Sequence, residues 1–358
     1  MEVSVPGYQF VNFLKSGAQA AVVQAKKNGI DYAVRIISDL QNPINVARAV
    51  RELLLLRNCC HENIIEILDI SIDLNLNKLE RLYITVPLMD YTFEEFAKID
   101  LWRNEKQNFY IRFFMIQILR GIDYLHRNSI LHRDLSSRNI MIKRNLHLKI
   151  IDFGLAREQH NFATMAAFTL PYQAPERVLE FESYDSKVDM WSVGCLFAEL
   201  ISGHRLFLTS PSSFPHLQLL QQSFSLEDKV PQFFQTQLRQ FYTEKEIQYV
   251  NDRIYQPIEN RFNFPSPNQK FDDIQAHSSQ NGLNVLKNLL RLYPEKRWSA
   301  EQTLKCPFFA DTAPRNKTLK NPTECQLVFE QINFANDKED INQLKVLLQK
   351  QIQLAPRL

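Results

Sequence analysis

The sequence predicts an α+β protein with two lobes: a small β-rich N-terminal lobe that carries one main helix, and a larger helical C-terminal lobe. A chain of 358 residues is long enough for two domains or for one large two-lobed domain. From Tyr8 to about Val86, β-branched and aromatic residues alternate in short runs, as they do in strands. From Thr92 onward, long amphipathic patterns at helical spacing dominate.

Each predicted element has its own signal in the sequence. The strands of the small sheet are predicted by four runs, YQFVNFL, AAVVQAK, DYAVRII and RLYITV, and one helical stretch at about 45–59 interrupts them. In the larger lobe, apolar residues recur at helical spacing at Phe109, Phe113, Ile116, Leu119 and Leu125. The polar segment 266–282 predicts a surface loop. A last helix is predicted at about 337–354, with one apolar face formed by Ile341, Leu344, Leu348 and Ile352.

The composition excludes several classes of protein, but it says little about which partners this protein binds. Lysine and arginine number 42 against 40 aspartates and glutamates, so the net charge of +2 gives no reason to favour nucleic acid or a membrane surface. The longest apolar runs are far shorter than the roughly 20 residues of a membrane-spanning helix, and the N-terminus lacks a secretory signal. Five cysteines without a C-x-x-C pair argue against a disulfide framework and a zinc site. We therefore expect a soluble protein of the cytoplasm, the nucleus or both, with no nucleic-acid or membrane partner.

Two segments carry the chemistry. ILHRDLSSRNI occupies residues 130–140, and IIDFGLAR occupies residues 150–157. A phosphoryl-transfer site must hold magnesium, cradle phosphates and orient a hydroxyl, so carboxylates and donors have to converge. In that chemistry Asp134 is the candidate catalytic base, and Asn139 and Asp152 are candidate oxygen ligands of magnesium. Either tripeptide alone fits a solvated turn, but both together, each beside a β-branched run, favour a site for ATP and Mg²⁺.

With these motifs, the chain resembles the eukaryotic protein kinases from about Tyr8 to Phe309. Three further segments agree in order and spacing: QAPE at 173–176, DMWSVGCLFAEL at 189–200, and RLYPEKRWSAEQTLKCPFF at 291–309. The resemblance implies a two-lobed kinase-like fold with an N-lobe at about 8–86, a hinge at about 87–90, a C-lobe at about 91–309, and an extension at 310–358. Within the family, RELLLLRNCCHENIIEILDI and VDMWSVGC are most similar to the mitogen-activated and cyclin-dependent group.

The resemblance also implies roles for particular residues. Glu176 and Arg297 would form a buried ion pair, and Asp189 would brace the backbone around His132. Glu52 would pair with the cation of the strand and, with Asp134, Asn139 and Arg35, complete the catalytic set. The nucleotide would be held by Lys15, Gly17, Val22, Ala33, Arg35, Pro87, Met89 and Met141. Pro87 is compatible with that role because the family uses its backbone carbonyl, which a proline keeps.

The phosphate-binding residues depart from the family pattern. The hairpin usually reads G-x-G-x-x-G-x-V, whereas here only Gly17 of the three glycines is present. This loss restricts the backbone and weakens ATP binding without forbidding it. Arg35 replaces the strand lysine, and a guanidinium is wider than the compact ammonium that should lie between Glu52 and the phosphates. Lys15 or Lys26 could reach the phosphates instead, but the favoured interpretation of both is a solvated lysine.

The catalytic loop and the activation segment resemble different kinds of kinase, so they point to different residues as acceptors of the phosphate. Ser136 stands where serine/threonine kinases have a lysine, and Arg138 recreates a spacing that resembles the HRDLAARN loop of tyrosine kinases. Thr169, in TLPYQAPE, instead matches the serine/threonine kinases. We weigh Thr169 and the overall likeness above Arg138, which favours serine and threonine as acceptors and leaves a tyrosine-directed kinase as the lesser alternative.

The activation segment indicates how the protein could be regulated, and the catalytic residues bear on whether it is an active kinase. Thr164 lies at the position of the activating threonine, and an upstream kinase acting on it would allow a phosphothreonine to pair with Arg133. The alternative, an ordinary loop threonine without a regulatory role, fits the sequence equally well. Ala166 replaces the tyrosine of the T-x-Y motif, which excludes dual phosphorylation there. The favoured hypothesis is a divergent kinase that phosphorylates protein substrates in mitogen-activated-kinase-like signalling. The alternative is a pseudokinase scaffold that acts by binding proteins, but such a scaffold has no chemical need for Asp134, Asn139 and Asp152 together.

Overall fold

The computed structural model describes residues 4–16, 20–75, 78–98, 107–158, 170–179, 184–207, 279–312 and 341–353. The chain divides into two compact units. The first, here called the sheet unit, comprises Met1–Tyr91, Met141–Glu158 and Lys317–Leu358. The second, the helical unit, comprises Thr92–Ile140 and Gln159–Asn316.

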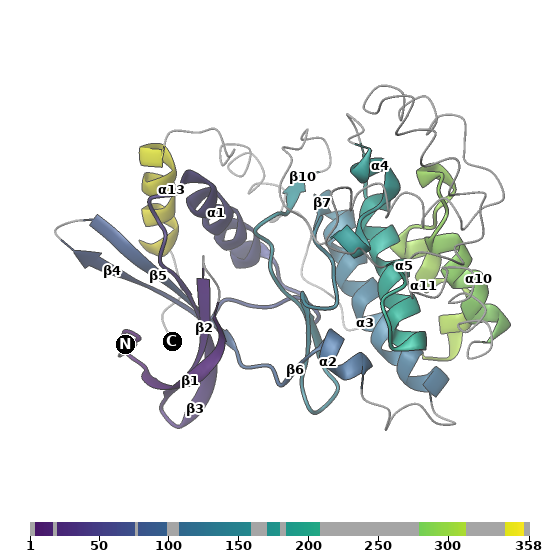
Figure 1. Ribbon diagram of the computed structural model, residues 1–358, viewed down its shortest axis with the longest axis horizontal. Helices are drawn as coiled ribbons and strands as arrows, with labels where there is room; N and C mark the ends of the chain where they lie inside the picture. The colour runs from purple at the N-terminus through teal and green to yellow at the C-terminus, as the bar shows by residue number, and fades with distance from the viewer. Residues whose placement is uncertain are drawn as a thin grey trace, which may run out of the picture. The chain divides into compact units, whose positions relative to one another are not determined.

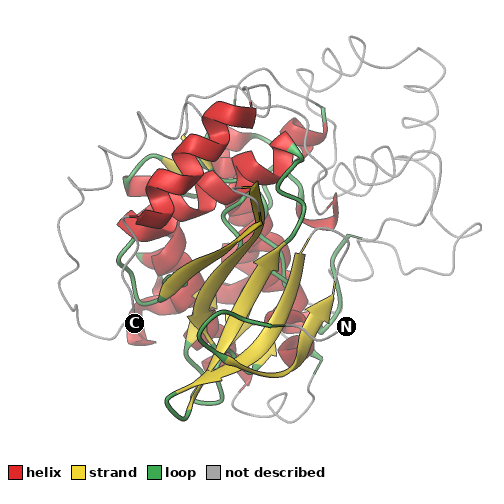
Figure 2. Ribbon diagram, turned by 90° about the vertical axis from the view of Figure 1, so that its left-hand side faces the viewer, coloured by secondary structure: helices red, strands yellow, loops and turns green. Residues whose placement is uncertain are grey.

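The sheet unit is built on a five-stranded antiparallel sheet (Figure 2). Its strands follow the order β1-β2-β3-β5-β4, with bounds β1 (Gln9–Ser16), β2 (Ala20–Lys27), β3 (Ile30–Ile37), β4 (Asp69–Asn75) and β5 (Lys78–Pro87). The four predicted strands are therefore confirmed. The fifth, β4, was not predicted, because its aspartates and asparagine weaken an alternation in which Ile70 is the buried residue.

Alternation along the central strands creates the core of this unit. Val23 and Ala25 on β2 are fully buried and pack with Val34, Ile36 and Tyr83 in one hydrophobic cluster. Successive side chains of a strand point to opposite faces, so the intervening residues of β2 and β3 line the other face of the sheet. Arg35 is one of these intervening residues, and the register places it opposite Val22.

Two helices of the sheet unit lie side by side (Figure 1). The predicted helix at about 45–59 is confirmed as α1 (Pro43–Asn58), which begins where the Asn42 side chain accepts a hydrogen bond from the amide of Ile44 at 3.0 Å. The predicted C-terminal helix is α13 (Ile341–Gln353), which contacts α1. Leu348, one of four residues predicted on its apolar face, is fully buried. The side chains of Ile341 and Leu344 lie outside the described residues, as do positions 337–340.

Short strands carry the loops of the motifs. They are β6 (Tyr91–Thr92), β7 (Ile130–Leu131), β8 (Ile140–Ile142), β9 (Leu148–Ile150) and β10 (Arg157–Glu158). β8 and β9 are neighbours in one sheet. β7 leads into the HRD segment, and β9 leads into the DFG segment. Each motif thus follows a buried strand end.

The helical unit is organised around α5 (Lys187–Ser202), which contacts α3 (Gln107–Arg127) and α10 (Gln280–Leu289). Every residue from Val188 to Ile201 is buried, as expected of a helix whose residues are mainly apolar around its circumference. It ends at Gly203, whose φ of 78° is a left-handed conformation that glycine adopts readily. The other described elements are α2 (Phe93–Ala97), η2 (Leu170–Tyr172), α4 (Pro175–Val178), η3 (Pro294–Lys296), α11 (Ala300–Leu304) and η4 (Pro307–Thr312).

Two expectations about the helical unit need correction. The predicted loop at 266–282 ends earlier than expected, because α10 begins at Gln280 and Ser279 caps it by accepting from the Gly282 amide at 3.2 Å. Residues 266–278 lie outside the described part of the chain. Phe109, expected on the buried face of α3, is 49% exposed, whereas Ile116, Leu119 and Leu125 are buried. No described helix is both long and apolar enough to cross a bilayer.

Candidate active site

The catalytic loop of the helical unit folds back on itself between Asp134 and Asn139. Nδ2 of Asn139 donates to the backbone oxygen of Asp134 at 2.7 Å and to its Oδ2 at 2.9 Å. The amide of Asp134 donates to Nδ1 of His132 at 3.3 Å. These hydrogen bonds orient the Asp134 carboxylate, and they use the side-chain nitrogen of Asn139 as a donor to Asp134. The oxygen of that amide is the side-chain atom of Asn139 that remains for a cation.

Asp189, at the start of α5, holds the backbone that precedes this loop. Its two carboxylate oxygens accept from the amides of His132 at 2.9 Å and Arg133 at 2.8 Å, and Nε2 of His126 lies 3.0 Å from Oδ2. Burial by itself raises the pKa of Asp189, but the hydrogen bonds from His126 and the Arg133 amide outweigh it and lower the pKa below its ordinary value. The predicted brace around His132 is therefore confirmed.

The predicted ion pair between Glu176 and Arg297 is also confirmed. Nη1 of Arg297 donates to Oε1 of Glu176 at 2.7 Å, and Nη2 donates to Oε2 at 3.2 Å. Both side chains are buried, with 0% exposure for Arg297 and 2% for Glu176. The guanidinium also donates to the backbone oxygens of Arg291 and Lys187. This pair ties α4 to the segment before α11, which is a structural role.

Arg133, the predicted partner of a phosphothreonine, is buried beside a second arginine. Its guanidinium lies 5.8 Å from the ring centroid of Tyr184, and that of Arg177 lies 5.3 Å from the same ring. Nη1 of Arg177 donates to the backbone oxygen of Arg133 at 2.7 Å. Burial lowers the pKa of Arg177 to about 10. Both arginines and Asp134 line one cavity, and Thr164 lies outside the described residues.

The sheet unit contributes the second set of predicted site residues. Nη1 of Arg35, on β3, donates to Oε1 and Oε2 of Glu52, on α1, at 2.9 and 2.7 Å. The same nitrogen lies 3.8 Å from Oδ1 of Asp152, which follows β9 with a left-handed φ of 63°. Arg35 therefore joins the helix glutamate to the aspartate of the DFG segment. Attraction to Glu52 raises the pKa of Arg35, whereas burial raises the pKa of Glu52 and Arg35 offsets part of that rise.

One nitrogen of Arg35 makes the contact with Glu52 that the resemblance implies for the strand lysine of the family. Nη1 serves both oxygens of Glu52 and faces Asp152. Within the described part of the chain, neither Nη2 nor Nε of Arg35 makes a hydrogen bond. The side chain is 29% exposed, so these two donors remain available to a ligand.

The register of the sheet brings several predicted nucleotide residues together. Lys15 on β1 is opposite Val22 on β2, and Val22 is opposite Arg35 on β3. Directly opposed residues lie on the same face of a sheet, and Ala33 shares that face because it lies two residues from Arg35. Gly17 lies outside the described residues. Lys26, the other candidate for the phosphates, forms an exposed ion pair with Asp31 at 3.7 Å, which supports its alternative as a solvated lysine.

The hinge and the strand after it contain the remaining residues that were predicted to bind the nucleotide. Pro87 ends β5 opposite Tyr32, and Met89 two residues later is 8% exposed. Met141 lies in the middle of β8 and is partly buried. All three belong to the sheet unit, as do Val22 and Ala33. Asp134 and Asn139 belong to the helical unit.

Comparison with known proteins decides the family. Residues 8–309 match the protein kinase domain. The chain is 33% identical to the mitogen-activated protein kinase pmk-1 of Caenorhabditis elegans, over 86% of this chain and 77% of that protein. It is 31% identical to the mitogen-activated protein kinase HOG1 of Exserohilum turcicum over 91% of this chain and 90% of that protein, and 30% identical to p38a of Drosophila melanogaster over 84% and 78%.

The chain belongs to the protein kinase family, in its mitogen-activated group. Its sheet unit, with α1, and its helical unit are the parts of the two-lobed α+β fold that the sequence predicts. Membership identifies it as a serine/threonine protein kinase of the signalling type and favours catalysis over the pseudokinase alternative. The family uses ATP as its phosphoryl donor.

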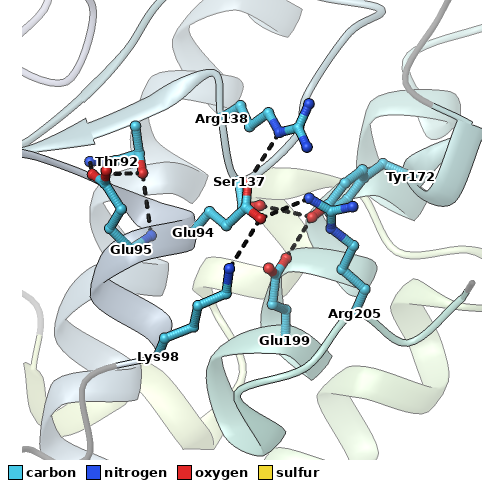
Figure 3. Close-up of polar contacts among 9 residues, drawn as sticks. All are labelled: Thr92, Glu94, Glu95, Lys98, Ser137, Arg138, Tyr172, Glu199 and Arg205. Carbon is cyan, nitrogen blue, oxygen red and sulfur yellow. Dashed lines mark hydrogen bonds and ion pairs between the residues drawn. The ribbon is translucent and has the colours of Figure 1, made fainter. Parts of the chain in front are cut away.

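The kinase also contains a polar network that sequence reasoning missed (Figure 3). The Ser137 hydroxyl lies 2.7 Å from the Tyr172 hydroxyl, which donates to Oε2 of Glu199 at 2.6 Å. All three side chains are buried, and burial raises the pKa of both Tyr172 and Glu199. The one available signal was that Ser137 stands where the family has a proline. No local pattern pointed to Glu94, whose amide donates to the backbone oxygen of Ser137 at 3.1 Å.

Proposed function

We propose that this kinase transfers the γ-phosphate of ATP to serine or threonine residues of protein substrates, with Asp134 as the catalytic base. The carboxylate of Asp134 is only partly buried and is oriented by Asn139, so it is available to accept a proton from a substrate hydroxyl. Arg35 and Glu52 position the phosphates of the donor. Catalysis of phosphoryl transfer is mainly positioning of the reactants and neutralisation of charge. In this proposal, Asp134 orients the acceptor hydroxyl, and Arg35 and Glu52 orient the phosphates.

Asn139 and Asp152 are the proposed ligands of Mg²⁺. The Asn139 amide offers its oxygen, because its nitrogen is bonded to Asp134. The Asp152 side chain is 40% exposed, and its Oδ1 accepts from the Gly154 amide at 3.4 Å and faces Arg35, which leaves Oδ2 outside both contacts. Both are the hard oxygen donors that magnesium prefers, so the residues fit the ion. When bound, magnesium neutralises charge on the transferred phosphoryl group.

The single observation that carries the proposal is the double hydrogen bond from Arg35 to Glu52 beside Asp152. An arginine at the lysine position was the main reason to doubt catalysis. Because one nitrogen makes the ion pair with Glu52, the other donors of the guanidinium can address phosphate oxygens. The replacement therefore weakens the site less than its chemistry alone suggests.

Thr164 and Arg133 form the proposed regulatory pair. A phosphate on Thr164 would add a charge that pairs with the buried guanidinium of Arg133. The upstream kinase is identified only by this chemistry, as an enzyme that phosphorylates Thr164. The protein substrates are those expected of the mitogen-activated group.

The test is Mg²⁺-dependent transfer of radioactive phosphate from ATP to a generic basic protein by the purified full chain. Asp134→Asn serves as the blank, because it keeps the shape of the side chain and removes the base. We expect incorporation by the wild type, none by the blank, and phosphoserine or phosphothreonine in the hydrolysed product. Equal signals from wild type and blank would overturn the proposal, and phosphotyrosine alone would overturn the choice of acceptor.

A further inference from the structure

Arg138 is an exposed arginine inside the catalytic loop. Its side chain is 59% exposed, and it directly precedes Asn139, whose amide lies 2.9 Å from the Asp134 carboxylate. Adjacent Cα atoms are about 3.8 Å apart, so the backbone of Arg138 lies next to the residue that contacts the proposed base. A protein segment that places a hydroxyl at Asp134 therefore comes within reach of this long side chain.

Glu94 on α2 holds the Arg138 side chain in place (Figure 3). Nε of Arg138 donates to Oε2 of Glu94 at 3.0 Å. Oε1 of the same carboxylate accepts from Nη2 of Arg205 at 2.9 Å and from Nζ of Lys98 at 3.2 Å. Three cationic groups thus share one carboxylate. Burial raises the pKa of Glu94, but Arg138 and Lys98 outweigh it and keep the pKa below its ordinary value.

The backbone below Arg138 is fixed as well. Ser137 is fully buried, its hydroxyl bonds to Tyr172, and its backbone oxygen accepts from the Glu94 amide at 3.1 Å. Arg138 is therefore anchored at its backbone by the Ser137 network and at its Nε by Glu94. Such an arrangement reduces the conformational entropy that a long side chain loses when it binds a ligand.

The end of the guanidinium is left for a ligand. Within the described parts of the chain, the contact found for Arg138 is the one from Nε to Glu94, so Nη1 and Nη2 have no assigned acceptor there. The two other carboxylates drawn in Figure 3 are already engaged, since Glu95 accepts from Thr92 and the buried Glu199 accepts from Tyr172. A pair of parallel donors of this kind matches a carboxylate or a phosphate group.

We propose that Arg138, positioned by Glu94, determines substrate specificity by binding an acidic side chain of the substrate protein close to the phosphoacceptor. The inference rests on the proposed function, because it takes Asp134 as the place where the acceptor hydroxyl lies. The acidic group is a carboxylate or a phosphate added earlier to the substrate. Arg138 is thus a substrate-binding residue, and Glu94 is a positioning residue that acts through it.

The experiment compares peptides that differ in one flanking charge. A serine peptide is made in a neutral series, in a series with one aspartate moved through the positions on either side of the serine, and in a series with phosphoserine at the same positions. Both kcat/KM and equilibrium binding, measured by fluorescence anisotropy, are determined for each peptide. The binding measurement tests Arg138 even if phosphoryl transfer fails, so failure of this inference is distinguishable from failure of the proposed function.

For the wild type, we expect at least one aspartate position to raise kcat/KM and affinity roughly 5- to 20-fold over the neutral peptide, as a charge-assisted hydrogen bond at a half-exposed site allows. Arg138→Gln should reduce that ratio to about 1–2. Arg138→Glu should invert it, so that a lysine at the same position is favoured. Glu94→Gln should lower the ratio only in part, because the guanidinium is retained but no longer held.

Arg127→Gln is the matched control. Arg127 is 61% exposed and pairs with Asp123 at 2.8 Å, much as Arg138 pairs with Glu94, but it lies at the end of α3 outside the catalytic loop. Its replacement should leave the acidic-to-neutral ratio unchanged. A wild-type ratio near 1 at every position, or a high ratio that persists in Arg138→Gln, would overturn the inference. A preference for phosphoserine over aspartate would identify a phosphorylated substrate as the source of the acidic group.

Discussion

Replacing Arg35 by lysine tests how the phosphate site works. Nη1 of Arg35 lies 2.9 and 2.7 Å from the two oxygens of Glu52, and a lysine ammonium in the place of Nη1 can make both contacts. What the substitution removes is the rest of the guanidinium, which is broad and planar and projects beyond that nitrogen. We expect Arg35→Lys to raise kcat/KM, because the charge then lies in one compact group between Glu52 and the phosphates, and this gain exceeds the loss of the phosphate contacts open to Nε and Nη2 of the arginine.

The size of the effect follows from the geometry. One well-placed hydrogen bond to a charged group contributes about 1.5–3 kcal/mol, and about 1.4 kcal/mol corresponds to a tenfold change in rate. The Arg35 side chain is 29% exposed, so solvent screening reduces the gain. We therefore expect an increase of roughly 3- to 10-fold rather than the full value. Because Glu52 keeps its cation, stability should change by less than about 1 kcal/mol.

The assay is the initial rate on a generic basic protein at several ATP concentrations, so that kcat and KM separate. Glu52→Gln is made in the wild-type and the Arg35→Lys backgrounds, and it should lower kcat/KM in both. Arg127→Lys is the matched arginine-to-lysine control at an exposed ion pair. A rate that falls on restoring lysine would refute the reasoning, and would mean that the site has adapted to its arginine.

Three further predictions concern metal, stability and pH. Asp152→Asn should abolish the Mg²⁺-dependent part of the thermal shift given by ATP, because it removes a charged magnesium ligand; an unchanged shift would place the metal elsewhere. Glu176→Gln should destabilise the protein by about 3 kcal/mol, since it leaves the buried Arg297 without its anion. Glu301→Gln, at an exposed ion pair with Lys305, is the control and should leave the midpoint of the same urea titration nearly unchanged. Folding lowers the pKa of Asp189, so its contribution to the free energy of unfolding is complete above its unfolded pKa of about 3.9 and is lost as pH falls through the folded value. Asp189→Asn should therefore reduce the loss of stability below about pH 4. Unchanged stability of the variant relative to wild type across this acid range would contradict the prediction.

The strands and helices of the described residues were largely predictable from local patterns. β1, β2, β3 and β5 have alternating β-branched or aromatic residues, and α1 has a capping asparagine followed by proline. β4 was missed because its propensity is weak and it is held by pairing with β5. The start of α10 was missed because its first residues are polar and read as part of the preceding loop. The buried apolar residues that stabilise the helix come later in its sequence. Phe109 was wrongly expected to be buried. Periodicity identifies the apolar face of a helix, but it does not show at which residue neighbouring elements stop packing against that face.

Part of the candidate site was also predictable. The ion pairs Glu176–Arg297 and Arg35–Glu52 and the brace from Asp189 could be expected from motifs alone. The roles of Asp134, Asn139 and Asp152 in transfer stay predictions, as do those of Gly17 and Thr164, which lie outside the described residues. The Ser137, Tyr172 and Glu199 network could not be predicted, because its members come from three segments without a shared motif.

The sequence by itself determined the family, the order of the elements and the residue types that phosphoryl transfer requires, because these depend on local patterns and on short motifs. Only the tertiary structure decided that a single nitrogen of Arg35 serves both oxygens of Glu52. It also decided that Glu94, 44 residues before Arg138 in the chain, holds that arginine. The reason is physical: a hydrogen bond depends on a few tenths of an ångström and on direction, and the packing of separate segments sets both.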